Sequence, residues 1–183
     1  MTEEIIIAGF GGQGVLSMGK ILSYSGIMQD QEVSWMPSYG PEMRGGTANV
    51  TVIISDERVS SPVLTEFDTA IILNQQSMDK FEKSVKPGGF MLYDPNGITR
   101  HPERKDINIF KIEAAKLSAE MGNTKIFNMV VLGAYLNMRP IVKLENVIRG
   151  LKKSLPERYH SLIPLNESAI KKGMENIENI IAL

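Results

Sequence analysis

The feature that most constrains the fold lies near the start of the chain, where a short apolar run meets a glycine-rich segment. Ile5-Ile6-Ile7-Ala8 is unbroken and apolar, and Gly9-Phe10-Gly11-Gly12-Gln13-Gly14 follows it directly. Such a run is typical of a strand buried on both faces of a parallel sheet. From Val15 to about Gly26 the apolar residues take helical spacing. The pattern therefore predicts a central strand, a glycine loop and a helix in succession.

Further segments continue this alternation. Apolar and β-branched runs predict strands at 32–36, 48–55, 69–74, 90–94 and 108–112, with a helix at 77–85. The last third of the chain predicts helices at 113–121, 126–138, 144–155 and 166–183. Strands that alternate with helices are typical of a sheet covered on both faces. We expect residues 1–183 to form one α/β domain, with a single doubly wound, mostly parallel, Rossmann-like sheet and a helical C-terminal layer.

The composition excludes several classes of protein. The 183 residues include 20 basic and 21 acidic side chains and no cysteine. Without cysteine the chain cannot supply a disulfide scaffold, a catalytic thiol or the thiolate ligands of an iron–sulfur cluster. The near-neutral charge argues against a nucleic-acid partner. The acidic start and the lack of a long apolar run predict a cytoplasmic protein with no membrane partner.

The glycine loop fits the pattern G-x-G-x-x-G between a strand and a helix, where backbone amides can approach an anionic group. The alternative is that the glycines serve only tight packing of strand on helix. A dinucleotide site also needs an acidic residue at the end of the second strand. That strand ends Trp35-Met36-Pro37 without one, which argues against NAD and FAD.

An overlapping segment, Gly14 to Lys20, matches the G-x-x-x-x-G-K pattern of a nucleotide-phosphate loop. The next residue is Ile21, where that motif has a Ser or Thr to bind magnesium. Val15 and Met18 also belong to the helical stripe, which places Lys20 well along the helix. A stand-alone nucleotide-binding module or small NTPase is therefore kept only as the alternative function.

A second unusual loop is expected between the strands at 32–36 and 48–55. Its ten residues, 37–46, contain three glycines and two prolines, so its backbone geometry is restricted. It should lie beside the glycine loop at the carboxyl edge of the sheet, where ligands bind in such folds. Arg44 offers a donor fork suited to phosphate or carboxylate. A rigid surface loop with an internal Glu42–Arg44 pair is the alternative.

Three blocks in order, 11–15, 39–46 and 52–62, resemble the gamma subunit of the 2-oxoacid:ferredoxin oxidoreductases. They are Gly11-Gly12-Gln13-Gly14-Val15, then Tyr39-Gly40-Pro41-Glu42-Met43-Arg44-Gly45-Gly46, and finally Val52-Ile53-Ile54-Ser55 with Ser60-Ser61-Pro62. The chain length of 183 residues also suits that subunit. A looser likeness extends through Asp68 and the strand ending at Asn74.

The resemblance implies a subunit of an enzyme that oxidatively decarboxylates a 2-oxoacid, forms an acyl-coenzyme A and reduces ferredoxin. Thiamine diphosphate, magnesium and iron–sulfur clusters would belong to the alpha and beta partner subunits and a ferredoxin-like delta subunit. This chain would bind no cofactor tightly, would border the coenzyme A site and would be inactive alone. The 2-oxoglutarate type is favoured over the pyruvate, 2-oxoisovalerate and indolepyruvate types, from the region Trp35–Gly46.

The resemblance also implies which residues contact coenzyme A or the partner chains. The candidates are Gly11, Gly12, Gln13, Gly14, Tyr39, Gly40, Glu42, Arg44, Gly45 and Gly46. None is expected to act as a catalytic acid, base or nucleophile. The two histidines, His101 and His160, lack metal-ligand spacing, so no metal site is predicted.

Overall fold

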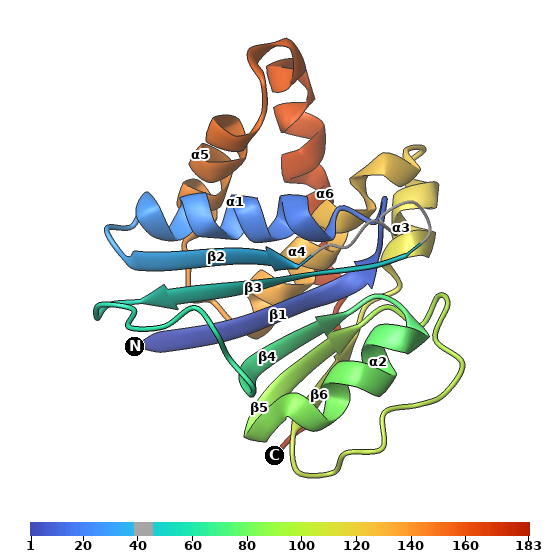
Figure 1. Cartoon of the computed structure of the whole chain (residues 1–183). Helices are drawn as coiled ribbons and strands as arrows, with labels where there is room; N and C mark the ends of the chain where they lie inside the picture. The colour runs from blue at the N-terminus through green and yellow to red at the C-terminus, as the bar shows by residue number, and fades with distance from the viewer. Residues whose placement is uncertain (39–45) are drawn as a thin grey trace.

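The computed structural model of the chain describes residues 1–38 and 46–183, which form a seven-stranded sheet with helices on both faces (Figure 1). In order, the elements are β1 (Thr2–Phe10), α1 (Val15–Ile27), β2 (Glu32–Ser38), β3 (Thr47–Ser55), β4 (Phe67–Ile72), α2 (Gln75–Phe81), β5 (Val85–Tyr93), β6 (Asn108–Lys111), α3 (Ala114–Glu120), α4 (Phe127–Met138), α5 (Leu144–Ser154), α6 (Ile163–Glu175) and β7 (Glu178–Ile181). Short 3₁₀ turns are η1 (Glu82–Ser84), η2 (Thr124–Ile126) and η3 (Glu157–Leu162).

The sheet has the strand order β2-β3-β1-β4-β5-β6-β7. Its middle is parallel, because β1 pairs with β4, β4 with β5 and β5 with β6 in the same direction. Antiparallel strands extend it on both sides: β3 pairs with β1 and β2, and β7 pairs with β6. The predicted α/β class and the internal position of the first strand are confirmed. The sheet is parallel at its centre and antiparallel toward both edges.

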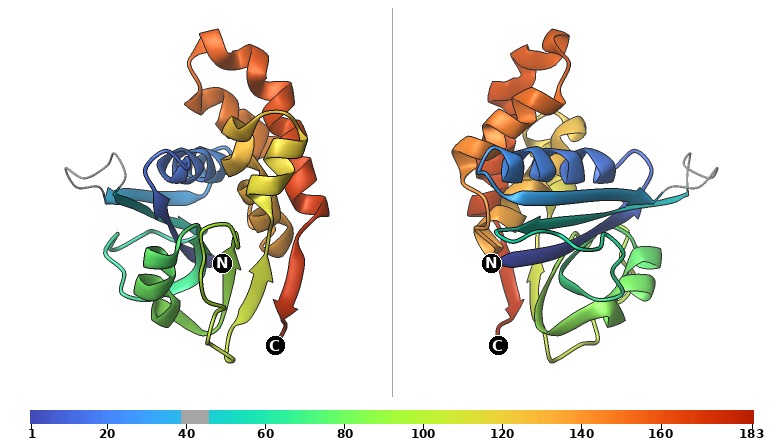
Figure 2. Two further views of the ribbon diagram at one scale, coloured as in Figure 1. Left: turned by 90° about the vertical axis from the view of Figure 1, so that its right-hand side faces the viewer. Right: turned by 60° about the vertical axis from the view of Figure 1, so that its left-hand side comes forward.

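Alternation along the central strands explains why helices cover both faces. Ile5 and Ile7 of β1 belong to a large core cluster with α1, α3, α4, α5 and α6, whereas Ile6 and Ala8 belong to a second cluster with α2. Successive side chains of a strand point to opposite faces, so an unbroken apolar run requires two covered faces. Figure 2 shows this division, with α2 on one side of the sheet and α1, α4 and α6 on the other.

The main error of the sequence prediction concerns the C-terminus. The sequence predicts a helix over 166–183, but α6 ends at Glu175 and residues 178–181 form β7. Phe110 of β6 pairs with Asn179 of β7, so β7 covers what would otherwise be the open edge of the sheet. A four-residue strand with an exposed face carries little signal of its own. Pairing with β6 decides its structure.

Smaller differences occur elsewhere. The predicted helix at 77–85 is the shorter α2 followed by η1 and the start of β5. Strand β2 continues through Pro37 to Ser38, so the loop expected from residue 37 begins later. Among the described residues no helix is long and apolar enough to cross a membrane.

Candidate functional site

The glycine loop Gly9–Gly14 connects the carboxyl end of β1 to the first turn of α1. A Cβ atom on Gly9 would lie 2.5 Å from Gln13 Oε1 and 2.9 Å from Leu73 Cβ, so no larger residue fits there without displacing them. Gly14 precedes α1 with φ of 75°, a left-handed conformation that glycine adopts without strain. The predicted order of strand, glycine loop and helix is confirmed.

Gln13 holds this loop closed through its own side chain. Its Oε1 accepts a hydrogen bond from the backbone N–H of Phe10 at 2.6 Å, and its Nε2 donates to the carbonyl oxygen of Leu73 at 3.2 Å. Leu73 directly follows β4, so the amide fastens the loop to the neighbouring parallel strand. Only a side chain that both accepts and donates can make this pair of bonds. The structure therefore gives Gln13 a bracing role in addition to its predicted place at the site.

The first turn of α1 opens onto a cavity of about 300 Å³, lined by Phe10, Gly11, Gly12, Gly14, Val15, Leu16, Ser17 and Ala48. We call it the glycine-loop cavity. The first N–H groups of a helix have no partner within the helix, and the helix dipole makes that end positive. Gly14 provides no side-chain cap, and the first turn of α1 carries no acidic residue. Such an end is suited to a phosphate or carboxylate.

The end of the second predicted loop lies beside the glycine loop. Strands β2 and β3 form a hairpin whose last described pair is Ser38 with Asn49, and β3 starts opposite β1 with Thr47 paired to Phe10. The N–H of Gly11 donates to the carbonyl oxygen of Gly46 at 3.1 Å. The structure thus brings Gly46 to the predicted residues of the glycine loop. The candidates Tyr39, Gly40, Glu42, Arg44 and Gly45 lie outside the described residues.

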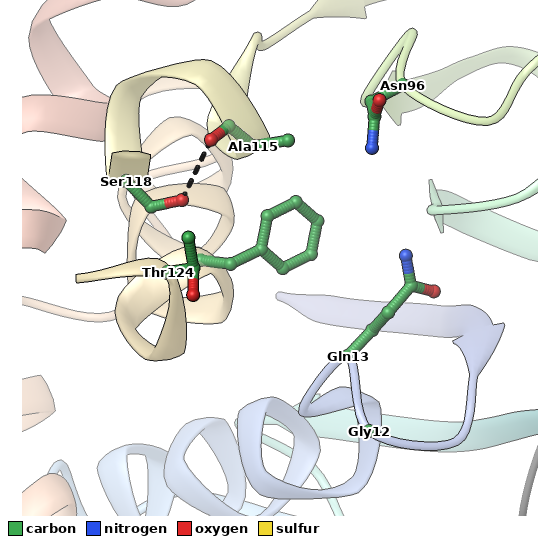
Figure 3. Close-up of a pocket in the computed structure, with 7 residues that line it drawn as sticks. Gly12, Gln13, Asn96, Ala115, Ser118 and Thr124 are labelled. Atoms are coloured by element: carbon green, nitrogen blue, oxygen red, sulfur yellow. Dashed lines mark hydrogen bonds between the residues drawn. The ribbon is translucent and has the colours of Figure 1, made fainter. Parts of the chain in front are cut away.

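A second cavity, of about 210 Å³, lies on the other side of the glycine loop (Figure 3). It is lined by Gly12, Gln13, Asn96, Ala115, Ser118, Thr124 and Phe127. The figure shows the amides of Gln13 and Asn96 facing the same space, which Phe127 also lines. Its polar groups are uncharged, so this cavity is suited to a neutral polar group. Sequence reasoning missed Asn96, Thr124 and Phe127, which carry no motif and come from segments far from the glycine loop.

Asp94 positions two sides of this second cavity. Its carboxylate accepts hydrogen bonds from the backbone N–H groups of Asn96, at 2.7 Å, and Ala115, at 2.9 Å. Asp94 is 1% exposed. Burial raises the pKa of this carboxyl, and the bonds from the two N–H groups act against the rise. The residue therefore joins the loop after β5 to the start of α3.

The remaining sequence candidates do not line the two cavities at the glycine loop. Lys20 lies within α1, as predicted, and not at the tip of a phosphate-binding loop. His160 Nε2 lies 3.1 Å from the carbonyl oxygen of Lys152 and 3.0 Å from that of Leu155, near the end of α5. In the parts of the chain that the structure describes, no three His, Cys, Asp or Glu side chains are grouped to hold a metal ion.

Comparison with known proteins identifies the family. Residues 4–176 match the family described as pyruvate ferredoxin/flavodoxin oxidoreductase. The 2-oxoglutarate synthase subunit KorC of Methanocaldococcus jannaschii is 35% identical over 179 residues, which cover 96% of this chain and 94% of that one. The ketoisovalerate oxidoreductase subunit VorA of Methanothermobacter thermautotrophicus is 41% identical over 172 residues, which cover 94% of this chain.

The lengths of these relatives differ. The chain spans only 28% and 36% of the two ketoisovalerate oxidoreductase subunits that it matches. Among solved structures, the gamma subunit of a keto/oxoacid ferredoxin oxidoreductase from Geobacter sulfurreducens superimposes with a TM-score of 0.83 at 29% identity, over 96% of both chains. The likeness to gamma subunits that the sequence motifs indicated is therefore confirmed, and the chain belongs to the pyruvate ferredoxin/flavodoxin oxidoreductase family.

Proposed function

We propose that the chain is the gamma subunit of a multi-subunit oxidoreductase that decarboxylates a 2-oxoacid, forms an acyl-coenzyme A and reduces ferredoxin. The match over nearly the whole length of a KorC subunit supports this assignment. The lack of cysteine gives the chain an accessory role, because the clusters need thiolate ligands from another chain. Thiamine diphosphate, magnesium and the clusters belong, in this proposal, to alpha, beta and ferredoxin-like delta partners.

The glycine-loop cavity is the proposed place of contact with coenzyme A. The observation that carries this step is the uncapped start of α1, which opens onto a cavity of about 300 Å³ and has no acidic residue in its first turn. Backbone N–H groups there can donate to a phosphate of the coenzyme. Glu42 and Arg44, from the segment that joins Ser38 to Gly46, are proposed to contact the coenzyme or the partner chains.

Two 2-oxoacids are candidate substrates of the complex. 2-Oxoglutarate is supported by the relative that is matched over 94% of its own length, which is named 2-oxoglutarate synthase subunit KorC. Ketoisovalerate is supported by the higher identity, 41%, to a ketoisovalerate oxidoreductase subunit that is much longer than this chain. We take 2-oxoglutarate as the first candidate, because correspondence along the whole of both chains is the stronger likeness.

The test is isolation of the complex from the native host through an affinity tag on this chain. The expected result is co-elution of larger chains that carry thiamine diphosphate and iron. The complex should reduce ferredoxin when supplied with coenzyme A and 2-oxoglutarate, and more slowly with ketoisovalerate. Recovery of this chain without partners, together with tight binding of Mg–ATP or NAD, would instead favour the stand-alone nucleotide-binding module or small NTPase.

Arg44→Ala tests the proposed contact within the same complex. The variant should raise the KM for coenzyme A or weaken subunit assembly while the chain stays folded. Arg58→Ala is the matched control, because Arg58 is exposed in the stretch after β3. Unchanged assembly and coenzyme A kinetics in Arg44→Ala would remove Arg44 from the proposed site.

A further inference from the structure

A third cavity, of about 370 Å³, lies between α1, α4 and the segment that joins α5 to α6. We call it the lysine cleft. Its polar lining includes Ser17, Lys20, Lys125, Asn128, Tyr159 and Asn166. The family resemblance drew attention to none of them. Apolar side chains such as Ile21, Met129 and Leu155 complete the lining, so the cleft is polar on one part and apolar on another.

The charge of the lysine cleft differs from that of the whole chain. The chain has one more acidic than basic residue, but this cleft is lined by two lysines and no acidic side chain. Within the described residues neither lysine forms an ion pair. The Nζ atom of Lys20 lies 5.9 Å from the centre of the Tyr24 ring, which is a cation–π contact. Some lysines outside the cleft do form ion pairs, such as Lys111 with Glu178 at 2.9 Å. Two cations in a concave, partly apolar surface attract an anion.

A third cation lies near the cleft. The Arg158 guanidinium carbon is 4.9 Å from the centre of the Tyr159 ring, and Tyr159 is 42% exposed. Arg158 thus adds positive potential beside an aromatic surface. Aromatic rings with a cation close by are suited to a ligand that has both a flat organic part and a phosphate.

The lysine cleft is also continuous with the candidate site. Ser17, in the first turn of α1, lines both this cleft and the glycine-loop cavity. Asn128, from the first turn of α4, packs against Gly14 and lines the lysine cleft as well. A ligand with two separate phosphate groups can therefore place one at the start of α1 and the other between the lysines.

We propose that the lysine cleft binds a phosphate ester, with Lys20 and Lys125 on the phosphate and Tyr159 against the organic part. The proposal of a phosphate site stands on the cleft alone. Its assignment to coenzyme A rests on the proposed function: the 3′-phosphate of the coenzyme is then the group held by the two lysines.

The phosphate site is tested by calorimetric titration of the full chain with ADP at low salt, with adenosine for comparison. ADP should bind and adenosine should bind much more weakly. Lys20→Ala and Lys125→Ala should each weaken ADP binding by about tenfold, because each removes a charged donor. Lys20→Arg should retain most of the affinity. Lys83→Ala is the control, since Lys83 is exposed on η1, outside the cleft and beside α2.

ADP binding that is the same in Lys125→Ala as in the parent chain overturns the phosphate site, as does equal binding of ADP and adenosine. Dependence on Lys20 and Lys125 but not on Lys83 supports it. Because Lys125 does not line the glycine-loop cavity, its effect separates the two cavities.

The coenzyme A assignment is tested on the assembled complex by comparing coenzyme A with dephospho-coenzyme A, which lacks the 3′-phosphate. The parent complex should prefer coenzyme A by about tenfold in kcat/KM, and both lysine variants should abolish the preference. A preference that survives both variants overturns the assignment. If ADP binding depends on the lysines but the preference for coenzyme A in kcat/KM does not, the phosphate site is supported. Only its assignment to coenzyme A is then overturned.

Discussion

The backbone N–H of Gly11 donates to the carbonyl oxygen of Gly46 at 3.1 Å, next to the last β1–β3 pair, Phe10 with Thr47. Two motifs that are far apart in the sequence thus meet through the main chain. The bond depends on strand register and on no particular side chain. The two segments are therefore held together without a contribution from the side chains that flank them.

The first prediction concerns Gln13→Glu. A carboxylate can still accept from the Phe10 N–H, but it cannot donate to the Leu73 carbonyl and repels that oxygen. The free energy of unfolding should fall by about 1–3 kcal/mol at pH 7, measured by urea denaturation. The deficit should shrink in acid, where the introduced carboxyl is protonated and can donate.

Gln13→Met is the size-matched control for this prediction. It loses both hydrogen bonds but introduces no charge, so it should destabilise the chain less than the Glu variant at pH 7. Equal stability of Gln13→Glu and the parent chain would show that the amide does not brace the loop.

The second prediction concerns Tyr135→Phe. Tyr135 is fully buried, and its hydroxyl has no hydrogen-bond partner in the described part of the chain. Burial, and secondly the charge of Glu3, raise the pKa of this phenol well above its ordinary value. An unfolded tyrosine ionises near pH 10. Above that pH the unfolded state binds fewer protons than the folded state, so the free energy of unfolding falls as pH rises.

Tyr135→Phe should therefore raise the free energy of unfolding by about 1 kcal/mol at pH 7, since it removes an unsatisfied buried hydroxyl. The difference in the free energy of unfolding between this variant and the parent chain should grow above pH 10. Denaturation at a series of pH values measures it. Tyr159→Phe, at an exposed ring, should leave the stability at pH 7 unchanged. A destabilised Tyr135→Phe would indicate that the hydroxyl has a partner after all.

The third prediction concerns the ion pair between Glu3 and Arg139. Glu3 is 0% exposed and accepts from Arg139 Nε at 3.0 Å, from Arg139 Nη2, and from Thr69 Oγ1 at 2.6 Å. Arg139→Met should lower the free energy of unfolding by about 3–5 kcal/mol, because it leaves a buried carboxylate without its cation. The double variant with Glu3→Gln should lose less than the sum of the two single losses.

The exposed pair Lys171–Glu167, at 2.8 Å, provides a comparison for Glu3–Arg139. Glu167→Ala should cost at most about 0.5 kcal/mol. A similarly small loss in Arg139→Met, measured in the same denaturation experiment, would contradict the role given to the buried pair.

The fourth prediction concerns the purified chain on its own. It should show no visible absorbance from an iron–sulfur cluster after anaerobic reconstitution with iron and sulfide, because it has no cysteine. It should also not oxidise 2-oxoglutarate or ketoisovalerate with ferredoxin present. Turnover by the isolated chain would overturn the accessory role proposed for it.

The central part of the fold could be predicted because its strands are buried on both faces. Ile5–Ala8 shows this as an unbroken apolar run, and the glycine loop marks where the helix begins. The direction of β3 could not be predicted, since an apolar strand has the same pattern in parallel and antiparallel pairs. The strand at 178–181 could not be predicted either, because it forms only by pairing with Ile109 and its neighbours in β6. The sequence by itself continues the helical pattern through these residues.

Among the residues that line the cavities, those in a continuous motif could be named from the sequence. These are Gly11, Gly12, Gln13 and Gly14. Asn96, Lys125 and Asn128 were missed, because each stands alone in the sequence and reaches its cavity only through the packing of distant elements. The spacing of residues in the sequence indicates local structure, whereas a cavity forms only when helices and strands from distant parts of the chain pack together.

The β2–β3 hairpin has a practical consequence for protein engineering. Its strands bring Ser38 and Gly46 to the sheet edge through ladders of backbone pairs, independently of what lies between them. The seven positions 39–45 can therefore be exchanged as a cassette with those of a relative, while the anchoring strands keep their register. Such an exchange would test the contacts that are proposed for Glu42 and Arg44.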